Sequence, residues 1–525
     1  MKTTQAMADF LNALTEVVGF YGQACGSLRV SNLSLDSRSI QAGDGFVALQ
    51  GQVQHGLDYL PSVLDAGVHC IISDRPLNEN EQACCEACSN PPVVMVVAGL
   101  GRFLGQLGDW FYDSPSRFIK VIGITGTNGK TSSAHYVAQL LLASGQTPAL
   151  IGTLGNGVIQ YSLDELKATA NTTPDAIMVQ RLLSEFRQQG VNWVVMEVSS
   201  HALELGRIEK LSFECVALTQ IGRDHLDFHG SEQAYHAAKA KLFTDYDSRF
   251  QVLNNCDSLG QKLKAVLPNA LLYEDCSQTV IEGQEQCRDE LPGNLQCQRS
   301  DLKLEGMELE LVFETAHCRT DVPLMGRFNV ENVLCAVGIM KACGFDWPTC
   351  CQALGKLRPV KGRMQIVASH PTVIVDFAHT AEALQHVLTA IRQHLGGEEA
   401  GSGGGDLWVV FGCGGDRDTG KRPLMAKVAE DGADKVVLTS DNPRYEDPQA
   451  IAQQIMTGFV KPQEIKVLLD RKQAIQKVMR SAKPEDLVLI AGKGHEAYQD
   501  IEGVKQPFSD EQVVMDWLRQ NRDGV

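Results

Sequence analysis

One segment constrains the fold of this chain more than any other: a glycine-rich turn between an apolar strand and an amphipathic helix. The pattern predicts a strand over Phe118–Ile124 and a helix over Thr131–Ala143, joined by the sequence GITGTNGKTS at 123–132. Glycines let backbone N–H groups approach an anion closely, and the N-terminus of the following helix adds positive potential. A strand, a turn of this kind and a helix make up the start of an α/β unit, so we expect a parallel sheet here.

The residues of this loop are suited to holding nucleotide phosphates. Lys130 can reach the outer phosphates, and the hydroxyl group of Thr131 can bind Mg²⁺. The spacing departs from the general pattern G-x-x-x-x-G-K-[ST], because Ile124 stands at the position of its first glycine. The alternative is a glycine-rich turn without a ligand, but Lys-Thr directly at a strand-to-helix turn is hard to obtain by accident. We therefore expect ATP to bind to the loop. The expected contacts are Gly123, Thr125, Gly126, Thr127, Asn128, Gly129, Lys130, Thr131 and Ser132.

Two further segments carry side chains suited to a metal ion. Glu197 ends the apolar run Trp193–Met196, and a carboxylate at the carboxyl end of a strand lies on the edge where α/β sheets bind ligands. The segment 223–230, with the sequence RDHLDFHG, places two His and two Asp in eight positions. The alternative for this segment is a hydrogen-bonded turn, since His alone is weak evidence for a ligand. Together with the loop, both segments favour metal or phosphate binding.

The chain is long enough for several domains. At roughly 150 residues per domain, 525 residues correspond to about three or four domains. Turn-rich or proline-containing breaks near 113–116 and 358–359 predict three α/β domains, over 1–114, 115–357 and 358–525. The stretch 251–325 is less regular, with short alternating strands. In the last domain, strand-like runs alternate with helical stretches, which predicts a doubly wound, Rossmann-like parallel sheet. These runs are Val373–Asp376, Leu407–Phe411, Lys435–Ser440 and Leu487–Ala491, and Gly396–Asp406 is expected to be a surface loop.

Composition narrows the class of protein. With 47 Lys and Arg against 64 Asp and Glu, the net charge of −17 disfavours a nucleic-acid-binding coat, which needs a basic face. No stretch approaches the roughly 18 uninterrupted apolar residues of a membrane span, and the N-terminal segment lacks the apolar region of a signal peptide. The cysteines at 84–88 and 350–351 lack the spaced pairs or His partners of a zinc site. We expect reduced thiols and a cytoplasmic protein.

Seven motifs, taken in order, resemble those of the ATP-dependent Mur ligases of peptidoglycan synthesis. They are GITGTNGKTS, MEVSSHAL (196–203), RDHLDFHG, AAKAKLF (237–243), MGRFNVENV (325–333), FGCGGDRDTGKRP (411–423) and AGKGHEAY (491–498). The resemblance runs from Leu35 to Glu496, nearly the whole chain. GTNGKT alone marks a wider group that includes folylpolyglutamate synthases, whereas DNPR at 441–444 marks the branch that adds diaminopimelate.

The resemblance implies an N-terminal domain for the UDP end of the substrate, a central ATPase domain and a C-terminal domain for the incoming amino acid. Asp376–Thr380 resembles a segment usually written DYAHTP, with Phe377 for Tyr and Ala381 for Pro. Position 205 is Leu where relatives often have Gln. The implied contacts to the UDP-muramyl-peptide are Leu35, Ser37, Gln52, Val53, Gln54, Asn171, Thr172, Thr173, Ser199, Leu205 and Arg207, and those to ATP beyond the loop are Asn329, Arg363, Asp376 and His379.

The same resemblance assigns the metal region and the amino-acid site. Glu197 and His225 match the Mg²⁺ region, and Lys239 matches a lysine that the family carbamylates, which would make it an anionic metal ligand. Without the family, Lys239 would be taken for a solvated helix lysine like Lys241. The implied amino-acid contacts are Arg417, Asp441, Asn442, Pro443, Arg444, Gly492 and Glu496.

Arg444 is the residue expected to choose the amino acid. Its guanidinium can form two hydrogen bonds to a carboxylate. Meso-2,6-diaminopimelate carries a second α-carboxylate on the carbon that in lysine carries only the side-chain ammonium. A cation at position 444 therefore favours diaminopimelate and repels lysine. The alternative is a surface turn that happens to contain Arg. Glu496 could pair with the ammonium group of the incoming amino acid.

The expected function is therefore an ATP-dependent ligase. It would add meso-2,6-diaminopimelate to the D-glutamate γ-carboxylate of UDP-N-acetylmuramoyl-L-alanyl-D-glutamate through an acyl phosphate. One Mg²⁺ would be held by Thr131 and Glu197, and a second by His225 and carbamylated Lys239 (N6-carboxylysine). The alternatives are a related ligase with another amine or a folate substrate, and a regulatory ATPase that ligates nothing. A monomer is expected.

Overall fold

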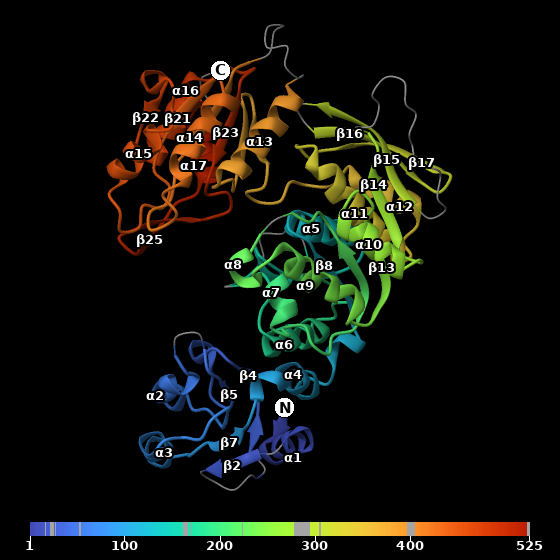
Figure 1. Cartoon of the computed structure of the whole chain (residues 1–525), viewed down its shortest axis with the longest axis vertical. Coiled ribbons are helices and arrows are strands. Elements are labelled where there is room, and N and C mark those ends of the chain that lie inside the picture. Colours follow the sequence, from blue (N-terminus) through green and yellow to red (C-terminus); the bar gives the residue numbers. More distant parts are fainter. Residues whose placement is uncertain are drawn as a thin grey trace. The chain divides into compact units, whose positions relative to one another are not determined.

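The structure is a computed structural model of the chain. It describes residues 1–521 except 16, 22–25, 27, 52–53, 161–165, 170, 223, 278–293, 304–305 and 396–404. Most of the surface loop expected at 396–406 therefore lies outside the described residues. Two compact units divide the chain, Met1–Leu272 with Gly338–Phe345, and Tyr273–Val337 with Asp346–Val525. Figure 1 labels the helices and strands of both units.

The first unit begins with a five-stranded sheet whose strands are parallel except for one edge strand. Neighbouring residues in its strands face opposite cores, so that Val47 and Ile72 pack in one core while Phe46 and Ile71 pack in the other. The strand order is β2 (Val17–Tyr21), β7 (Val93–Val97), β6 (Cys70–Ser73), β5 (Gly45–Ala48) and β4 (Leu33–Ser34), with β2 antiparallel. The helices are α1 (Thr4–Leu14), α2 (Leu60–Asp65), α3 (Glu79–Glu86) and α4 (Leu104–Phe111).

The rest of the first unit is a larger sheet that carries the glycine-rich loop. Its central strands are buried except for Lys120 at the start of β8, as expected for parallel strands covered on both faces. The loop joins β8 to α5, and the predicted boundaries of both are within two residues of the structure. The strand order is β10 (Gly155–Val158), β9 (Pro148–Gly152), β11 (Trp193–Glu197), β8 (Lys120–Thr125), β12 (Phe213–Leu218) and β13 (Ser248–Asn254), antiparallel only between β10 and β9.

The helices of this part surround the sheet and frame the loop. Helix α6 buries Val179 and Leu183 against the same core as Val194 of β11. Its Ile177 packs in the core of the five-stranded sheet, so α6 joins the two halves of the first unit. The helices are α5 (Lys130–Ala143), α6 (Ala176–Gln188), α7 (Ser200–Glu204), α8 (Leu226–His229), α9 (Glu232–Thr244) and α10 (Ser258–Val266).

The second unit begins with antiparallel strands. The sequence pattern predicted short strands over 251–325, whereas the structure has two hairpins with strands of 10, 8 and 7 residues. The alternation itself is present, since buried Met307, Leu309 and Leu311 alternate with partly exposed Glu308 and Glu310, and only the lengths of the strands differ from the prediction. Helix α12 packs on this sheet through Trp347, whose ring stacks on Phe313 with centroids 5.9 Å apart. The elements are β14 (Leu271–Asp275), which contains one boundary between the units, β15 (Asn294–Lys303), β16 (Gly306–Phe313), β17 (Ala316–Val322), α11 (Phe328–Ala342), whose residues from Gly338 on belong to the first unit, and α12 (Trp347–Leu354).

The second unit ends with the doubly wound sheet that the sequence predicted. Ile374 and Val409 face a core with α13, α14 and α15, while Val375 and Val410 face a core with α16 and α17. All strands are parallel except the edge strand β18. The order is β18 (Gln365–Ser369), β19 (Thr372–Asp376), β23 (Leu487–Ala491), β20 (Leu407–Phe411), β21 (Lys435–Leu438) and β22 (Lys466–Val467). The helices are α13 (Ala381–His394), α14 (Lys421–Gly432), α15 (Pro448–Met456), α16 (Arg471–Ser481) and α17 (Asp510–Asn521), and β24 (Tyr498–Ile501) pairs with β25 (Val504–Pro507).

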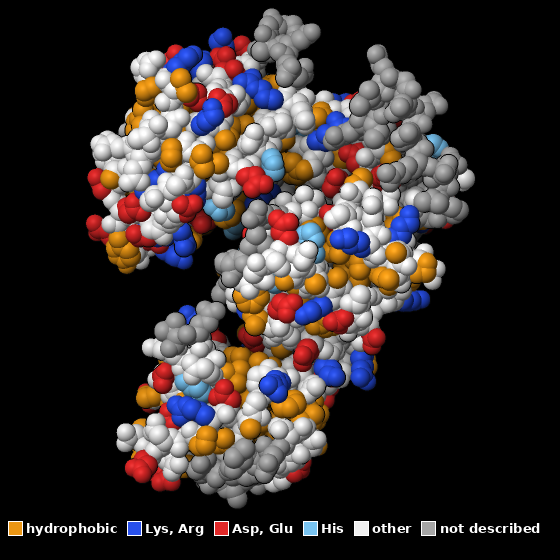
Figure 2. Space-filling view, in the orientation of Figure 1, with side chains coloured by type: hydrophobic (Ala, Val, Ile, Leu, Met, Phe, Trp, Pro, Cys, Tyr) orange, Lys and Arg blue, Asp and Glu red, His pale blue; other side chains and the backbone are white. Residues whose placement is uncertain are grey.

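The surface carries charges of both signs. In Figure 2 basic and acidic side chains are interspersed over the face shown, without a broad region of one sign. Within the part of the chain that the structure describes, no helix has both the length and the apolar character that crossing a bilayer requires.

Candidate functional site

The glycine-rich loop between β8 and α5 is held in a fixed shape by the two residues that directly follow the neighbouring strand β12. Gly126 and Gly129 have φ values of +153° and +85°, which favour glycine. A Cβ atom on Gly126 would lie 1.9 Å from the hydroxyl oxygen of Thr219, so only glycine fits there. That hydroxyl donates a hydrogen bond of 2.6 Å to the carbonyl oxygen of Asn128, and Thr127 N–H donates to the carbonyl oxygen of Gln220 over 2.8 Å. The loop is thus built for close approach of a ligand to its backbone.

Lys130 is the first residue of α5, and its side chain returns over the loop. Its ammonium group donates hydrogen bonds to the carbonyl oxygens of Gly126 (2.8 Å) and Thr127 (2.9 Å). A cation therefore lies over the backbone at a helix N-terminus. The cation and the helix N-terminus would both stabilise phosphate oxygens at this place. Thr131 and Ser132 follow in the first turn of the helix and are half-buried. The structure confirms the strand, turn and helix that the sequence predicted.

Glu197 lies at the carboxyl end of β11, adjacent to β8, and its carboxylate meets the loop. Thr131 Oγ1 donates a hydrogen bond of 2.8 Å to Glu197 Oε2. Thr153 donates to the same carboxylate through its N–H (2.8 Å) and its hydroxyl group (3.1 Å). Glu197 is 1% exposed, and a Cβ atom on Gly152 would lie 2.4 Å from its Oε1 atom. Three hydroxyl and amide groups therefore fix one buried carboxylate beside the loop.

This oxygen-rich arrangement fits a magnesium ion. Mg²⁺ prefers oxygen ligands and is held in nucleotide sites by one or two protein groups together with phosphate oxygens and water. The hydroxyl of Thr131 and the carboxylate of Glu197 supply such a pair. The described residues contain no group of three or more His, Cys, Asp and Glu side chains suited to a metal, which is compatible with an ion completed by phosphates.

The segment 171–173 lies against the backbone of Glu197 and against Thr153, which binds the Glu197 carboxylate. Thr173 Oγ1 donates a hydrogen bond of 2.8 Å to the backbone carbonyl oxygen of Glu197, and Ser199 N–H donates to Thr173 Oγ1 over 3.1 Å. Arg207 donates to the carbonyl oxygen of Thr173 over 2.8 Å. Thr172 Oγ1 lies 3.1 Å from Thr153 Oγ1, and Asn171 is exposed next to it. The structure thus brings together, around Thr173 and its bond to Glu197, five residues with implied substrate contacts: Asn171, Thr172, Thr173, Ser199 and Arg207. Leu205 follows α7 and is 55% exposed.

Lys239 extends from α9 into the loop. Its ammonium group donates a hydrogen bond of 2.7 Å to the carbonyl oxygen of Gly126, and the side chain is 1% exposed. It also lies 4.7 Å from the ring centre of Tyr235, whose hydroxyl is 2.9 Å from Thr127 Oγ1. Burial, and then the charge of Lys130, hold the pKa of Lys239 well below its ordinary value. Lys239 is therefore not a solvated surface lysine, unlike Lys241.

His225 lies on the exposed side of the same cluster. It has a φ of +50°, and its Nε2 atom lies 3.4 Å from Asp224 Oδ2. The His225 ring lies 6.4 Å from that of Tyr235 and 4.8 Å from that of His201, measured between centroids. Tyr235 thus contacts both His225 and Lys239. Arg223 and the side chain of Asp227 are outside the described residues.

The residues implied for the UDP end belong to the five-stranded sheet. Leu35 follows β4 and packs at the edge of its core, and Ser37 begins a short 3-10 turn capped by Asp36. Gln54 is exposed and accepts a hydrogen bond of 2.6 Å from the hydroxyl of Tyr59. Gln52 and Val53 lie outside the described residues.

In the second unit, the implied nucleotide residues differ in exposure. Asp376 ends β19 and is 5% exposed, and it accepts hydrogen bonds from Met364 N–H (2.7 Å) and Ala378 N–H (2.8 Å). Burial raises the pKa of this carboxyl group. Asp376 therefore fixes the backbone around it, whereas His379 is exposed. The Arg363 guanidinium lies 4.8 Å from the ring centre of Phe377. Asn329 is buried and donates to the carbonyl oxygen of Met325 over 2.7 Å.

Arg444 occupies a strained turn after β21. Its φ is +51°, and its N–H and carbonyl groups are paired with Asp500 and Glu502 of the β24–β25 hairpin over 2.9 and 2.8 Å. The guanidinium Nη1 donates a hydrogen bond of 2.6 Å to the carbonyl oxygen of Gly415. A non-glycine residue at positive φ costs free energy and is kept only where the surroundings require it. The backbone and the guanidinium of Arg444 are thus both held in place.

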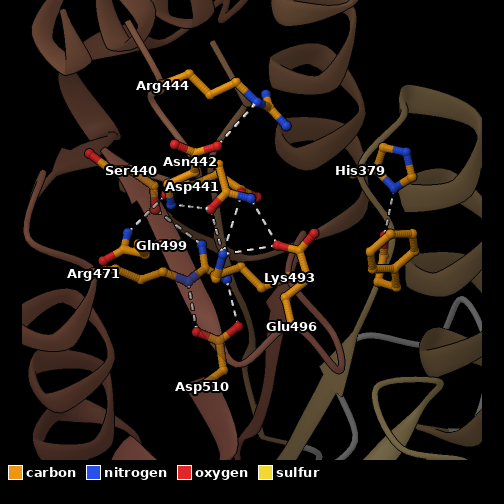
Figure 3. A network of polar contacts seen from close by, with 12 residues as sticks. His379, Ser440, Asp441, Asn442, Arg444, Arg471, Lys493, Glu496, Gln499 and Asp510 are labelled. Carbon is orange, nitrogen blue, oxygen red and sulfur yellow. Dashed lines mark hydrogen bonds and ion pairs between the residues drawn. The ribbon is translucent and has the colours of Figure 1, made fainter. Parts of the chain in front are cut away.

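Beneath this turn lies a buried polar network (Figure 3). Lys493 is fully buried, and its ammonium group donates to Asn442 Oδ1 (2.9 Å) and Glu496 Oε2 (3.0 Å). Asn442 Nδ2 also donates to Glu496 Oε2 over 2.8 Å. Burial raises the pKa of Asp441, and Gly492 is required beside it, because a Cβ there would lie 2.4 Å from Asp441 Oδ2. The network fixes one oxygen of Glu496.

Arg417 is exposed on the loop that follows β20. A Cβ atom on Gly414 would lie 3.0 Å from Arg444 Nη1 and 3.9 Å from Arg417 Cγ, so the two arginines flank this glycine. A Cβ atom on Gly415 would lie 1.9 Å from the carbonyl oxygen of Pro443. The loop after β20 and the turn after β21 are therefore packed together, at the edge of the sheet where parallel α/β folds bind ligands.

The sequence pattern did not predict several residues of these sites. Thr153, Thr219 and Tyr235 hold the loop and Glu197, but each comes from a different element, and none belongs to a recognisable pattern with the loop. The sequence did contain a signal for a special role of Lys493. This lysine lies between two glycines directly after a predicted strand, which is an unusual place for a lysine.

Comparison with protein families agrees with this geometry. Residues 29–104 match the model for the Mur ligase family catalytic domain, 124–340 that for the Mur ligase middle domain, and 362–494 that for the Mur ligase glutamate ligase domain. Two relatives are named UDP-N-acetylmuramoyl-L-alanyl-D-glutamate–2,6-diaminopimelate ligase. The one from Haemophilus ducreyi is 39% identical over 98% of this chain and 100% of its own length, and the one from Alkalilimnicola ehrlichii is 40% identical over 93% and 95%.

Solved structures give the same picture. A structure of a UDP-N-acetylmuramoyl-L-alanyl-D-glutamate–2,6-diaminopimelate ligase is 32% identical and covers 99% of both chains with a TM-score of 0.66. The MurF ligase from Thermotoga maritima, solved in complex with ADP, is 16% identical with a TM-score of 0.60 over 94% of this chain and 98% of its own, and this likeness concerns the fold. On its sequence and over nearly its full length, the chain belongs to the Mur ligase family.

Proposed function

We propose that this chain joins meso-2,6-diaminopimelate to the D-glutamate γ-carboxylate of UDP-N-acetylmuramoyl-L-alanyl-D-glutamate, at the expense of ATP. The observation that carries the proposal is the combination of two sites: the loop with Lys130, Thr131 and Glu197, and the pair of arginines, Arg417 and Arg444, beside Gly414. The relatives at 38–40% identity are named for this reaction.

The loop holds the phosphates of ATP in this proposal. Backbone N–H groups of 126–131 and the Lys130 ammonium face the β- and γ-phosphates, and Thr131 and Glu197 would hold Mg²⁺. When bound, Mg²⁺ neutralises phosphate charge. Lys130 already lies against two loop carbonyl oxygens, so little reorganisation is needed to stabilise the charge that gathers on the transferred phosphoryl group.

The muramyl-peptide would present its carboxylate next to Glu197. Residues 171–173, Ser199 and Arg207 surround that position. An oxygen of the D-glutamate γ-carboxylate attacks the γ-phosphorus of ATP, which gives an acyl phosphate and ADP. The amine of diaminopimelate then attacks the acyl carbon, the amide bond forms, and inorganic phosphate leaves as the nitrogen gives up a proton. No side-chain nucleophile is required.

Lys239 is proposed to be carbamylated. A lysine amine reacts with CO₂ only when it is neutral, and its lowered pKa in this structure favours the neutral form. The nitrogen of the neutral amine bonds to the carbon of CO₂ and releases one proton, which leaves an anionic carbamate next to Lys130 in place of the amine. That product, together with His225, would hold a second Mg²⁺.

The amino-acid site supports diaminopimelate over lysine. Arg444 is fixed by Gly415, and Arg417 lies nearby, so two cations are available for the far carboxylate. Glu496 has one oxygen bound by Lys493 and Asn442, which leaves the other for an ammonium group. A site built around a charged hydrogen bond can reject an analogue without its partner by about 10⁴-fold.

The remaining assignments are part of the same proposal. Residues 1–114, 115–357 and 358–525 would serve the UDP end, ATP and the amino acid, and Asn329, Arg363, Asp376 and His379 would contact or frame the nucleotide. We also propose a cytoplasmic location, which is supported by the free cysteines among the described residues, since reduced thiols are typical of that compartment.

Release of phosphate from ATP tests the proposal. The purified chain should release phosphate in proportion to product only when both UDP-N-acetylmuramoyl-L-alanyl-D-glutamate and diaminopimelate are present. Turnover with lysine or a preformed dipeptide in place of diaminopimelate would identify a related ligase. Turnover that ignores both co-substrates would identify a regulatory ATPase and contradict the proposal.

A further inference from the structure

An ion pair between a buried arginine and a partly exposed glutamate lies behind the loop that carries Arg417. Arg422, in the first turn of α14, is fully buried. Its guanidinium donates two parallel hydrogen bonds to Glu446, from Nη1 to Oε2 and from Nη2 to Oε1, each 2.9 Å long. Glu446 comes two residues after Arg444. The pair therefore joins α14 to the turn after β21 in the two-bond geometry that fixes orientation best.

The same pair holds the loop at two points. Arg422 Nη2 donates to the carbonyl oxygen of Gly414 over 3.1 Å, and Glu446 Oε1 accepts from Asp416 N–H over 2.5 Å. Between these two anchors lies Gly415, whose carbonyl oxygen is the partner of Arg444 Nη1. The loop position that supports the Arg444 guanidinium is thus fixed on both sides by the ion pair.

There is little room for the loop to shift. Gly415 N–H donates to the carbonyl oxygen of Asn442 over 2.9 Å, and the turn approaches Gly415 too closely for any Cβ atom. Tyr445 N–H donates back to Asp416 Oδ2 over 3.2 Å. The Arg422 guanidinium, and then the Asp416 N–H group, keep the pKa of Glu446 below its ordinary value, so the pair stays charged near neutral pH.

We propose that Arg422 and Glu446 are positioning residues for recognition of the incoming amino acid: through 414–416 they set the places of the Arg417 and Arg444 guanidinium groups. This inference rests on the proposed function, because it concerns the same amino-acid site. Neither residue contacts the amino acid in this account. Their effect is geometric, since a charged fork that moves by about an ångström loses much of its advantage with a carboxylate.

Substitution of Glu446 tests the inference. Glu446→Ala should raise the KM for diaminopimelate roughly 10- to 100-fold, while the KM values for ATP and for the muramyl-dipeptide stay within about twofold. Preference for diaminopimelate over lysine should fall in parallel. Glu446→Gln should recover part of the loss, because its amide oxygen can still accept from Asp416 N–H.

Gln454 offers a matched control. It accepts a hydrogen bond of 2.6 Å from Arg422 Nη1 but has no bond to the loop in this network. Gln454→Ala should therefore leave the KM for diaminopimelate unchanged within about twofold, even if the melting temperature falls. A rise in KM as large as that of Glu446→Ala would show that any loosening of Arg422 has this effect and would overturn the specific role of Glu446.

The remaining outcomes are also decisive. Equal rises in the KM values for ATP and diaminopimelate, or a lower melting temperature with unchanged KM values, would show that the pair is merely structural. If Glu446→Ala does not fold, the same comparison is made with Glu446→Gln, for which we expect a smaller rise confined to diaminopimelate. If the unsubstituted chain does not use diaminopimelate, the proposed function fails. If the unsubstituted chain uses diaminopimelate and the variants have the same KM values as that chain, only the positioning inference fails.

Discussion

The ammonium group of Lys239 donates a hydrogen bond of 2.7 Å to the carbonyl oxygen of Gly126, inside the glycine-rich loop. A helix residue 113 positions away in sequence therefore contacts the backbone of the loop that we propose to bind phosphates. Because this amine is buried next to Lys130, its charged form is disfavoured. The same contact places at the loop an amine that its local sequence pattern alone would assign to a solvated helix lysine.

Removal of the Lys239 amine should abolish turnover. We expect Lys239→Ala to lose at least about 100-fold in kcat, because the anion that a carbamate supplies next to the phosphates is lost. Short carboxylic acids such as formate or acetate should restore part of the activity. The measurement is kcat with and without added acid.

Lys241 is the control on the same helix. Its side chain is more exposed and pairs with Glu204 over 2.8 Å. Lys241→Ala should keep nearly full activity and show no response to carboxylic acids. Full activity of Lys239→Ala would show that neither the amine nor a carbamate is needed.

Arg444 should decide the choice of amino acid. In Arg444→Ala the KM for diaminopimelate should rise by about 100-fold or more, while the KM for ATP stays within about twofold, since only the far carboxylate loses its partner. Steady-state kinetics with each substrate varied in turn checks this. Arg480→Ala, on the exposed side of α16, should change neither value. Equal effects on both KM values in Arg444→Ala would remove the argument for specificity.

The pH dependence of stability should report on His135, which is buried in α5 behind the loop. Burial lowers its pKa from 6.5 to about 4. The unfolded chain therefore takes up a proton at this residue near pH 6.5, and the folded chain does so only near pH 4. Stability due to this residue is fully present above pH 6.5 and is lost as the pH falls from 6.5 to about 4, at about 1.4 kcal/mol per pH unit.

Denaturant unfolding between pH 7.5 and 4.5 measures this dependence. His135→Phe should remove the contribution of His135 to this pH dependence, so that the free energy of unfolding falls less steeply as the pH is lowered. His317→Phe, a substitution on β17 at an exposed position, should leave the pH dependence unaltered. An unchanged slope in His135→Phe would mean that this imidazole takes up its proton at the same pH in both states.

Arg471 and Asp510 form a fully buried ion pair under the carboxyl edge of β23. Arg471 donates to Asp510 Oδ1 over 2.7 Å and to Oδ2 over 2.8 Å. Arg471→Met should lower the free energy of unfolding by about 3–5 kcal/mol, because it leaves the Asp510 carboxylate buried without its partner. The exposed pair Arg299–Asp301 is the control, and Arg299→Met should have no measurable effect on stability. A loss in Arg471→Met no larger than that of the control would contradict this account of the pair.

The sequence predicted the parts of the fold that depend on local pattern. The strand, loop and helix around Lys130 and the strands that end at Glu197 and Asp376 were all expected within two residues. The edge of the sheet at which ligands bind could be inferred, because parallel strands place their carboxyl ends together. This explains why Glu197, which is 66 positions from Thr131, could be proposed as its partner.

The features that the sequence did not predict depend on contacts between segments that are far apart in the chain. Tyr235, Thr153 and Thr219 contact the loop or its carboxylate only because α9, β9 and β12 are arranged around β8. The Arg422–Glu446 pair likewise needs α14 next to the turn after β21. The burial of Asp376 was not expected either, because its assignment as a nucleotide contact came from the family resemblance, which does not give the backbone partners of this carboxylate.

The most direct test is the product itself. The purified chain is incubated with UDP-N-acetylmuramoyl-L-alanyl-D-glutamate, magnesium, ATP and meso-2,6-diaminopimelate, and the nucleotide-linked product is weighed by mass spectrometry. The account predicts a product heavier than the starting dipeptide by one diaminopimelate less one water, with one phosphate released for each amide bond formed. Recovery of the unchanged dipeptide from a folded chain would contradict it.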